Sequence, residues 1–180
     1  MQTTLTIYSE KNPNEKEEVI QEFGKIKDLL ATQRIGFERW QAEKPLSEKA
    51  TPEEVADAYR TSIDKILSQG YKTFDVVSLY PDAPNAAEAR KKFLSEHTHG
   101  EDEVRFFVDG SGMFYVHADG KVFMLLCTKG DFISLPAGTT HWFDMGPKPF
   151  FKAIRVFNNP EGWVGHFTGS RIADQFPKYE

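Results

Sequence analysis

Apolar residues at helical spacing mark two segments in the first half of the chain, and a third segment has helix-forming composition. They recur every three or four positions over residues 15 to about 33 and again over 51–70, and residues 85–94 have high helix propensity. The second segment has a strong start, because Thr51 can act as N-cap and Glu54 stands three residues later. The pattern therefore predicts two amphipathic helices, each burying one apolar face, and a third helix over residues 85–94.

Short apolar runs separated by turn residues predict strands, which become frequent after residue 103. Asp119-Gly120 joins two of these runs and is a strong hairpin signal. The pattern is typical of an antiparallel β-barrel of jelly-roll type with helices packed outside. The predicted strands are Leu5–Tyr8, Ile35–Trp40, Phe74–Tyr80, Val104–Val108, Gly112–His117, Lys121–Leu126, Phe132–Leu135 and Phe150–Phe157.

Length and composition favour one domain over residues 1–180, with a helical N-terminal half (about 1–95) packed on the barrel. The net charge is −5 and no basic stripe appears along the chain, which argues against nucleic-acid binding. No apolar run is long enough to span a bilayer and no secretory leader is visible, so we expect a soluble, cytoplasmic monomer. The single cysteine, Cys127, lies in an apolar run and is predicted to be a core residue.

The candidate chemistry is concentrated between His97 and Glu103, in the sequence His-Thr-His-Gly-Glu-Asp-Glu, and at His141. His97 and His99 can converge only on a strand, because residues of equal parity share one face of a strand. Glu103 has the same parity and introduces a run of strand formers. Pro136 and Gly138 supply the turn chemistry that could bring His141 to the same place. These four side chains are predicted to bind one divalent transition metal.

Taken singly, each of these residues is better explained as a surface or hydrogen-bonded side chain, and only the combination indicates a site. Imidazole and carboxylate ligands suit Fe, Ni, Mn, Co, Zn or Cu, so ligand type alone does not choose the metal. The lack of cysteine ligands argues against a structural zinc site. Four protein ligands leave two positions of an octahedron open, which favours catalysis over a structural role.

Two motifs resemble those of the cupin superfamily. The first is His97-x-His99-x3-Glu103-x6-Gly110, and the second runs from Gly130 through Pro136 and Gly138 to His141. Two positions depart from the superfamily pattern, since Lys91 replaces a usual glycine and Met145 a usual asparagine, but neither is a metal ligand. Within the cupins, the whole chain resembles the acireductone dioxygenases of methionine salvage.

That resemblance implies a metal-dependent dioxygenase that cleaves 1,2-dihydroxy-3-keto-5-methylthiopentene, an acireductone, with O2. It implies one Fe(II) or Ni(II) per chain. The Fe(II) form is expected to give formate and 4-methylthio-2-oxobutanoate. The Ni(II) form is expected to give formate, CO and 3-methylthiopropionate.

An anionic enediol needs a positive partner, and two arginines are candidates. Arg105 shares the parity of the ligands, and Arg155 lies on an apolar strand face where a guanidinium needs an anion or an acid. The alternative for each arginine is a salt bridge. Three aromatic residues near the ligands in sequence could form the walls of the pocket, or they could simply pack in the core: Phe93, Phe143 and Trp163. Glu96 could act as a catalytic base, and its alternative is a solvated position in a loop.

Two other classes of protein fit the same ligands. A different cupin enzyme, such as a sugar-phosphate isomerase or another small-molecule dioxygenase, would use the same metal with other pocket residues. A non-catalytic binding or storage cupin would need no redox metal, and hydrolytic zinc catalysis is a third possibility. His117 and His166 lie outside both motifs and are predicted to be structural.

Overall fold

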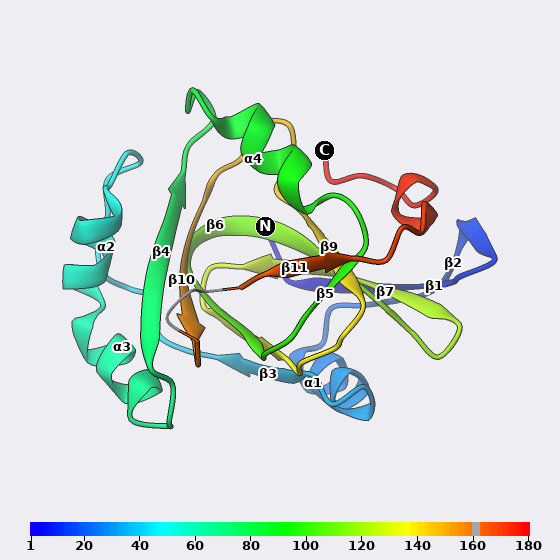
Figure 1. Ribbon diagram of the computed structural model, residues 1–180, viewed down its shortest axis with the longest axis horizontal. Coiled ribbons are helices and arrows are strands. Elements are labelled where there is room, and N and C mark those ends of the chain that lie inside the picture. The colour runs from blue at the N-terminus through cyan, green and yellow to red at the C-terminus, as the bar shows by residue number, and fades with distance from the viewer. Residues whose placement is uncertain (160–162) are drawn as a thin grey trace.

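The computed structural model describes residues 1–159 and 163–180. In these residues eleven strands form a curved antiparallel sheet, and four helices lie on its outside (Figure 1). The predicted mainly-β, cupin-type fold with external helices is confirmed.

Strand β6 (Glu103–Ala118) organises the sheet because it takes part in both faces of the fold. Its first half pairs with β8 (Asp131–Leu135) and β10 (Phe151–Phe157), and its second half with β7 (Lys121–Thr128) and β9 (His141–Asp144). Gly110 lies between the two halves with φ of 69°, and a Cβ there would lie 2.0 Å from the Phe150 carbonyl oxygen. Only glycine fits this change of direction.

The remaining strands extend these faces by antiparallel pairing. On one face β1 (Thr4–Ser9) pairs with β7 and with β2 (Asn12–Ile20). The same face continues to β5 (His97–His99), which lies between β9 and β11 (Gly165–Phe167). On the other face β3 (Gly36–Arg39) pairs with β8, and β4 (Thr73–Leu79) pairs with β10. A short 3-10 helix, η1 (Ile172–Asp174), precedes the C-terminal residues.

The predicted helix over 51–70 is two helices, α2 (Pro52–Ala58) and α3 (Arg60–Leu67). The predicted capping box is confirmed, since Thr51 Oγ1 accepts from the amide of Glu54 and the Glu54 carboxylate accepts from the amide of Thr51. The break at Tyr59 allows α2 to lie against β4 and α3 against β10. Helix α4 (Ala86–Phe93) matches the predicted third helix.

The helix predicted over residues 15 to about 33 is wrong in its first half. Residues 12–20 form β2, and only α1 (Phe23–Thr32) is helical. Residues 12–20 pair with β1 along the edge that β7 leaves open, and this backbone hydrogen bonding outweighs the helix propensity of the Glu-Lys run in the same residues. Residues 1–95, predicted as a helical half packed on the barrel, therefore contain β1–β4 as well as all four described helices. The single-domain assignment stays a prediction.

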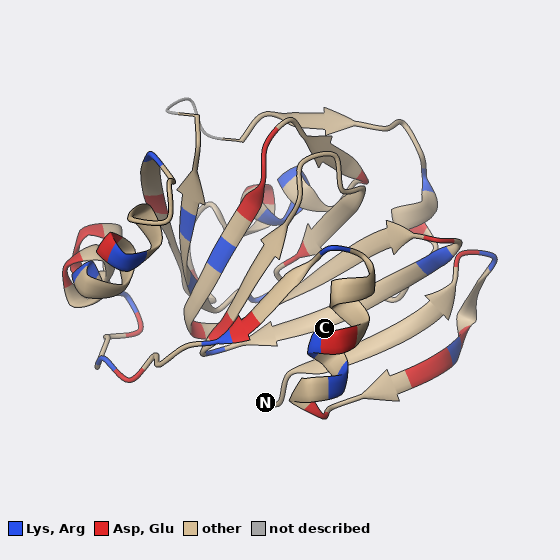
Figure 2. Cartoon of the chain, turned by 90° about the horizontal axis from the view of Figure 1, so that it is seen from below, with Lys and Arg blue, Asp and Glu red and all other residues tan. Residues whose placement is uncertain are grey.

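Three apolar clusters hold the sheet together. One lies inside the fold and includes Phe107, Phe114 and Phe143, and a second lies between the outer sheet face and α2 and α3. The third packs the C-terminal segment on the sheet and includes Trp142 and Phe176. Cys127 is fully buried, as predicted. No helix in the described part of the chain is long and apolar enough to cross a membrane. In Figure 2 the acidic and basic segments are interspersed along the coloured chain.

Candidate metal centre

Three imidazoles meet inside the fold because two neighbouring strands present them to one point. His97 and His99 come from β5, and His141 on β9 pairs directly across from His97. Their ligand nitrogens all lie within 4.8 Å of one another, and the three residues are between 2% and 7% exposed. The strand geometry predicted from sequence therefore brings the three histidines together.

Each imidazole is held in the same tautomer by a backbone carbonyl. Nδ1 donates to the Ser95 oxygen at 2.7 Å in His97, to the Val164 oxygen at 3.0 Å in His99 and to the Thr139 oxygen at 2.8 Å in His141. Because a carbonyl can only accept, the proton lies on Nδ1 and a neutral ring offers its Nε2 lone pair to the centre. This is the arrangement of histidines that bind a metal through Nε2.

Glu103 completes the group as the first residue of β6. Its Oε2 lies 2.8 Å from His141 Nε2 and 3.0 Å from His99 Nε2, and its buried Oε1 has no hydrogen-bond partner among the described residues. A carboxylate oxygen and an unprotonated Nε2 are both acceptors, so their approach needs a proton or a cation between them. A divalent metal would satisfy all four side chains at once, and the donor set fits it.

The pKa values agree with this reading. Burial is the main cause that lowers the pKa of His97 to about 4, which keeps the ring neutral. Burial would raise the pKa of Glu103, but the positive charge of Arg105 and the contacts with the His141 and His99 imidazoles outweigh it and hold the pKa well below its usual range. Burial would lower the pKa of His99, yet its hydrogen bond to Glu103 gives a net increase. A metal bound between Glu103 and His99 would take the place of the proton that this contact otherwise requires.

Arg105 lies behind Glu103 and is 3% exposed. Its Nε is 3.0 Å from Glu103 Oε1, too poorly aligned for a hydrogen bond, so the two charges form an ion pair and both atoms lack hydrogen-bond partners among the described residues. Burial lowers the Arg105 pKa and the Glu103 charge opposes that shift. Aromatic rings enclose the guanidinium at 4.4–5.9 Å, namely Phe143, Phe114, Trp163 and Phe93.

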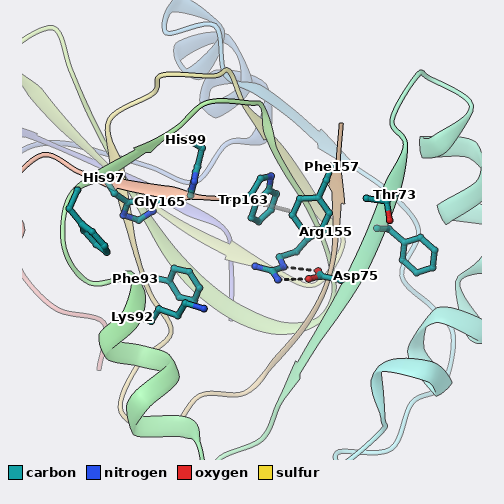
Figure 3. Close-up of a pocket in the computed structure, with 12 residues that line it drawn as sticks. Thr73, Asp75, Lys92, Phe93, His97, His99, Arg155, Phe157, Trp163 and Gly165 are labelled. Carbon is teal, nitrogen blue, oxygen red and sulfur yellow. Dashed lines mark hydrogen bonds and ion pairs between the residues drawn. The ribbon is translucent and has the colours of Figure 1, made fainter. Parts of the chain in front are cut away.

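A pocket of about 510 Å³ leads to the imidazoles (Figure 3). His97 and His99 lie at its inner end, and α4 contributes one wall with Lys92 and Phe93. The other walls come from β4, β10 and the segment that contains β11, with Thr73, Phe74, Asp75, Arg155, Phe157, Trp163, Gly165 and Phe167. Of the predicted substrate contacts, Phe93, Arg155 and Trp163 line the pocket, whereas Arg105 and Phe143 are buried behind it.

Arg155 already has an acidic partner. Its Nε donates to Asp75 Oδ1 at 2.7 Å and its Nη2 to Asp75 Oδ2, because the two residues face each other across β10 and β4. The guanidinium also lies over the ring of Trp163 at 4.9 Å. Arg155 therefore forms the salt bridge considered as its alternative role, while it remains part of the pocket wall.

Glu96, predicted as a catalytic base, has its carboxylate turned away from the pocket. Its Oε2 lies 2.6 Å from His117 Nδ1, and its Oε1 accepts from Thr168 Oγ1 at 2.8 Å. His117 Nε2 in turn lies 2.8 Å from the Glu10 carboxylate. The geometry gives Glu96 a supporting place beside His97, because neighbours in a strand point to opposite faces. Sequence reasoning did not identify Lys92, Asp75 or Phe157 as pocket residues, since no motif marks them.

Comparison with known proteins gives a consistent result. Residues 4–165 match the family model described as the ARD/ARD' family. The chain belongs to the ARD/ARD' family. Among curated members of related sequence, "Acireductone dioxygenase 2" of Pectobacterium atrosepticum is 50% identical over 98% of both chains. "Acireductone dioxygenase" of Synechococcus sp. is 54% identical over 97% of this chain and 98% of its own.

A solved structure is similar over most of the fold. It is described as an acireductone dioxygenase from Bacillus anthracis with a cadmium ion in its active centre. It is 29% identical to this chain, covers 92% of this chain and 98% of its own, and superposes with a TM-score of 0.78. The family predicted from the two motifs is thereby confirmed.

Proposed function

We propose that this ARD/ARD' family member is an acireductone dioxygenase that holds one Fe(II) or Ni(II) through His97, His99, His141 and Glu103. The observation that carries the proposal is the shared tautomer of the three histidines, which leaves three Nε2 lone pairs grouped beside a carboxylate with an unpartnered oxygen. The names of the curated relatives support the reaction and the substrate.

The chain's own residues prepare the site for an anionic chelate. A bound metal supplies open coordination positions at which an enediolate and dioxygen can be brought together. Arg105 balances the charge of Glu103, so a further anion meets a centre of net positive charge. Phe93 and Trp163 form apolar walls that limit water at the inner end of the pocket. The backbone carbonyls of Ser95 and Thr139 keep two of the imidazoles oriented throughout.

The metal is proposed to select the products, as the family resemblance implies. The Fe(II) form is proposed to give formate and 4-methylthio-2-oxobutanoate. The Ni(II) form is proposed to give formate, CO and 3-methylthiopropionate. A role in methionine salvage, a cytoplasmic location and a monomeric state remain predictions.

The reaction is tested by O2 consumption and product analysis. Metal-free protein is reconstituted separately with Fe(II) and Ni(II) and given acireductone generated in place. We expect O2 uptake with both metals and different products for each. Confirmed metal loading without O2 uptake would contradict the proposal and favour a binding cupin, and turnover of a sugar phosphate without O2 would favour an isomerase.

Arg105 gives a sharper test of the site. We expect Arg105→Ala to weaken substrate binding more than metal binding, because the cation that balances Glu103 is lost while all four ligands remain. KM and metal content are compared with those of the unchanged protein. An unchanged KM with full activity would exclude Arg105 from substrate binding.

A further inference from the structure

The charges that face the pocket are not all paired. Arg155 is neutralised by Asp75, and Arg105 is ion-paired with Glu103 behind the imidazoles. The remaining charged side chain of the wall is Lys92, and no hydrogen bond or ion pair joins it to another residue in the described ranges 1–159 and 163–180. The pocket therefore presents one uncommitted cation.

Lys92 is placed by the last turn of α4. Its ammonium lies 5.5 Å from the centre of the Phe93 ring, the apolar wall next to it. Figure 3 shows Lys92 and Phe93 on one side of the pocket and the Asp75–Arg155 pair on the side opposite. Because Lys92 lines the pocket that leads to the imidazoles, its charge acts on a ligand that enters this pocket.

We propose that Lys92 is an anion-binding residue of the pocket, which attracts small oxyanions that chelate through two adjacent oxygens and holds them at the mouth. The inference rests on the proposed function, because that function requires an anionic enediolate to enter. It adds a recognition element that lies outside both cupin motifs and away from the metal ligands.

A structural role at the helix end is the competing explanation. Cations in the last turn of a helix interact favourably with its C-terminal dipole, and α4 ends with Arg90, Lys91 and Lys92. Lys91 shares that helix end and is also exposed, but it does not line the pocket. Lys91→Gln is therefore the matched control, since it removes one charge from the same turn without changing the entry path.

The probe is oxalate, a stable dianion with two adjacent chelating oxygens. Its binding to the Ni(II)-loaded protein is measured by calorimetry at low and high ionic strength, where the screening length is about 30 Å and about 3 Å. We expect Lys92→Gln to weaken oxalate binding about fivefold at low ionic strength, in line with about 1 kcal/mol for an exposed charge pair, and much less at high ionic strength. Lys92→Arg should restore binding, and Lys91→Gln should leave it unchanged.

The outcomes separate this inference from the proposed reaction. Equal oxalate affinity in the unchanged protein and Lys92→Gln, equal losses in both glutamine variants, or no oxalate binding by the loaded protein would each overturn the role of Lys92. A selective, salt-dependent loss in Lys92→Gln supports it. If the loaded protein shows that loss but consumes no O2 with acireductone, the oxidative function fails while the anion site stands.

Discussion

Glu103 and Asp144 are two buried carboxylates on neighbouring strands, each next to an arginine, and they differ in how their oxygens are used. Asp144 is fully buried at the end of β9. Its Oδ1 accepts from Arg90 Nε at 2.7 Å and from the Gly146 amide at 2.9 Å. Its Oδ2 accepts from Arg90 Nη2 at 3.0 Å and from the Tyr179 amide at 3.1 Å. These bonds join α4 and the C-terminal residues to the sheet.

Glu103 is 2% exposed, yet its partners leave it incomplete. One oxygen faces two imidazole nitrogens that carry no proton in the neutral rings, and the other has only the poorly aligned Arg105. Buried polar groups in folded proteins are normally satisfied, and an exception needs an explanation. The comparison teaches that a carboxylate surrounded by donors holds the fold together, whereas a carboxylate surrounded by acceptors is arranged for a cation.

The largest effect is expected from substitutions at Glu103 and the histidines around it. Glu103→Gln, His97→Ala and His141→Ala should each abolish retention of Ni(II) while leaving a folded protein, because each removes one of the four proposed ligands. Metal per chain is measured after equilibrium dialysis, with circular dichroism as the test of folding. His166→Ala is the control, because this exposed histidine pairs with Thr98 and lies outside the group. Stoichiometric Ni(II) in any of the three variants would remove that residue from the ligand set.

The second largest effect is expected from loss of Asp144, whose carboxylate has a full set of hydrogen-bond donors. Asp144→Ala should lower the free energy of unfolding by about 3–5 kcal/mol, because it leaves the Arg90 guanidinium without its buried partner. Urea denaturation of the metal-free proteins measures this loss. Glu103→Gln also removes the counter-charge of Arg105, but it keeps the shape of the side chain and its amide can donate to the unprotonated Nε2 of His141, so it should cost less in the same experiment. A larger loss for Glu103→Gln than for Asp144→Ala would contradict the distinction between the two sites.

Local signals in the sequence predicted much of the fold and the metal ligands. The capping box at Thr51 depends on residues within one turn, and the hairpin at Asp119-Gly120 needs only two residues with positive φ, observed at 51° and 69°. Strand parity likewise brought His97 and His99 to one face. It also places Glu96 on the opposite face, so the parity rule argued against its prediction as a base.

Non-local pairing accounts for what the sequence did not predict. Strand β2 forms because β1 has a free edge, which no local pattern reveals. The partner of Arg155 is Asp75, eighty positions away in the chain and directly opposite in the register of β10 and β4. Lys92 belongs to the pocket only because three distant segments meet in front of α4. Such neighbours follow from the assembled sheet and not from spacing along the chain.

Removal of the metal should change the free energy of unfolding by an intermediate amount, and this change should differ between the Glu103 and Asp144 variants. A metal that binds only the folded state stabilises it by about 2.7 kcal/mol at a free concentration of 100 times its Kd. We expect chelation of Ni(II) to lower the urea midpoint of the unchanged protein accordingly. Asp144→Ala should show the same difference between loaded and chelated forms, and Glu103→Gln should show none. A shift in Glu103→Gln equal to that of the unchanged protein would mean that Ni(II) stabilises the fold elsewhere.

Glu96 is a third buried carboxylate, and its partner His117 changes its charge with pH. Loss of this contact should have the smallest of these effects on the free energy of unfolding. Burial would lower the pKa of His117, but the hydrogen bonds to Glu10 and Glu96 raise it above its usual value. Because the pKa of His117 is higher in the folded protein, its contacts with the two carboxylates stabilise the fold fully when the pH is below the pKa of the unfolded chain, about 6.5. This stabilisation is lost as the pH rises through the pKa of His117 in the folded protein. His117 is 24% exposed, so we expect about 1 kcal/mol or less.

The variant His117→Gln compares the Glu96–His117 contact with the Asp144–Arg90 ion pair. The difference in unfolding free energy between the unchanged protein and the variant should be larger at a pH of about 5.5 than at about 8.5, because only the protonated ring bridges two carboxylates. Arg90→Gln is the matched control, since a guanidinium stays charged over this range and its loss should cost the same at both pH values. A pH-independent difference for His117→Gln would show that this link is held by packing and not by charge.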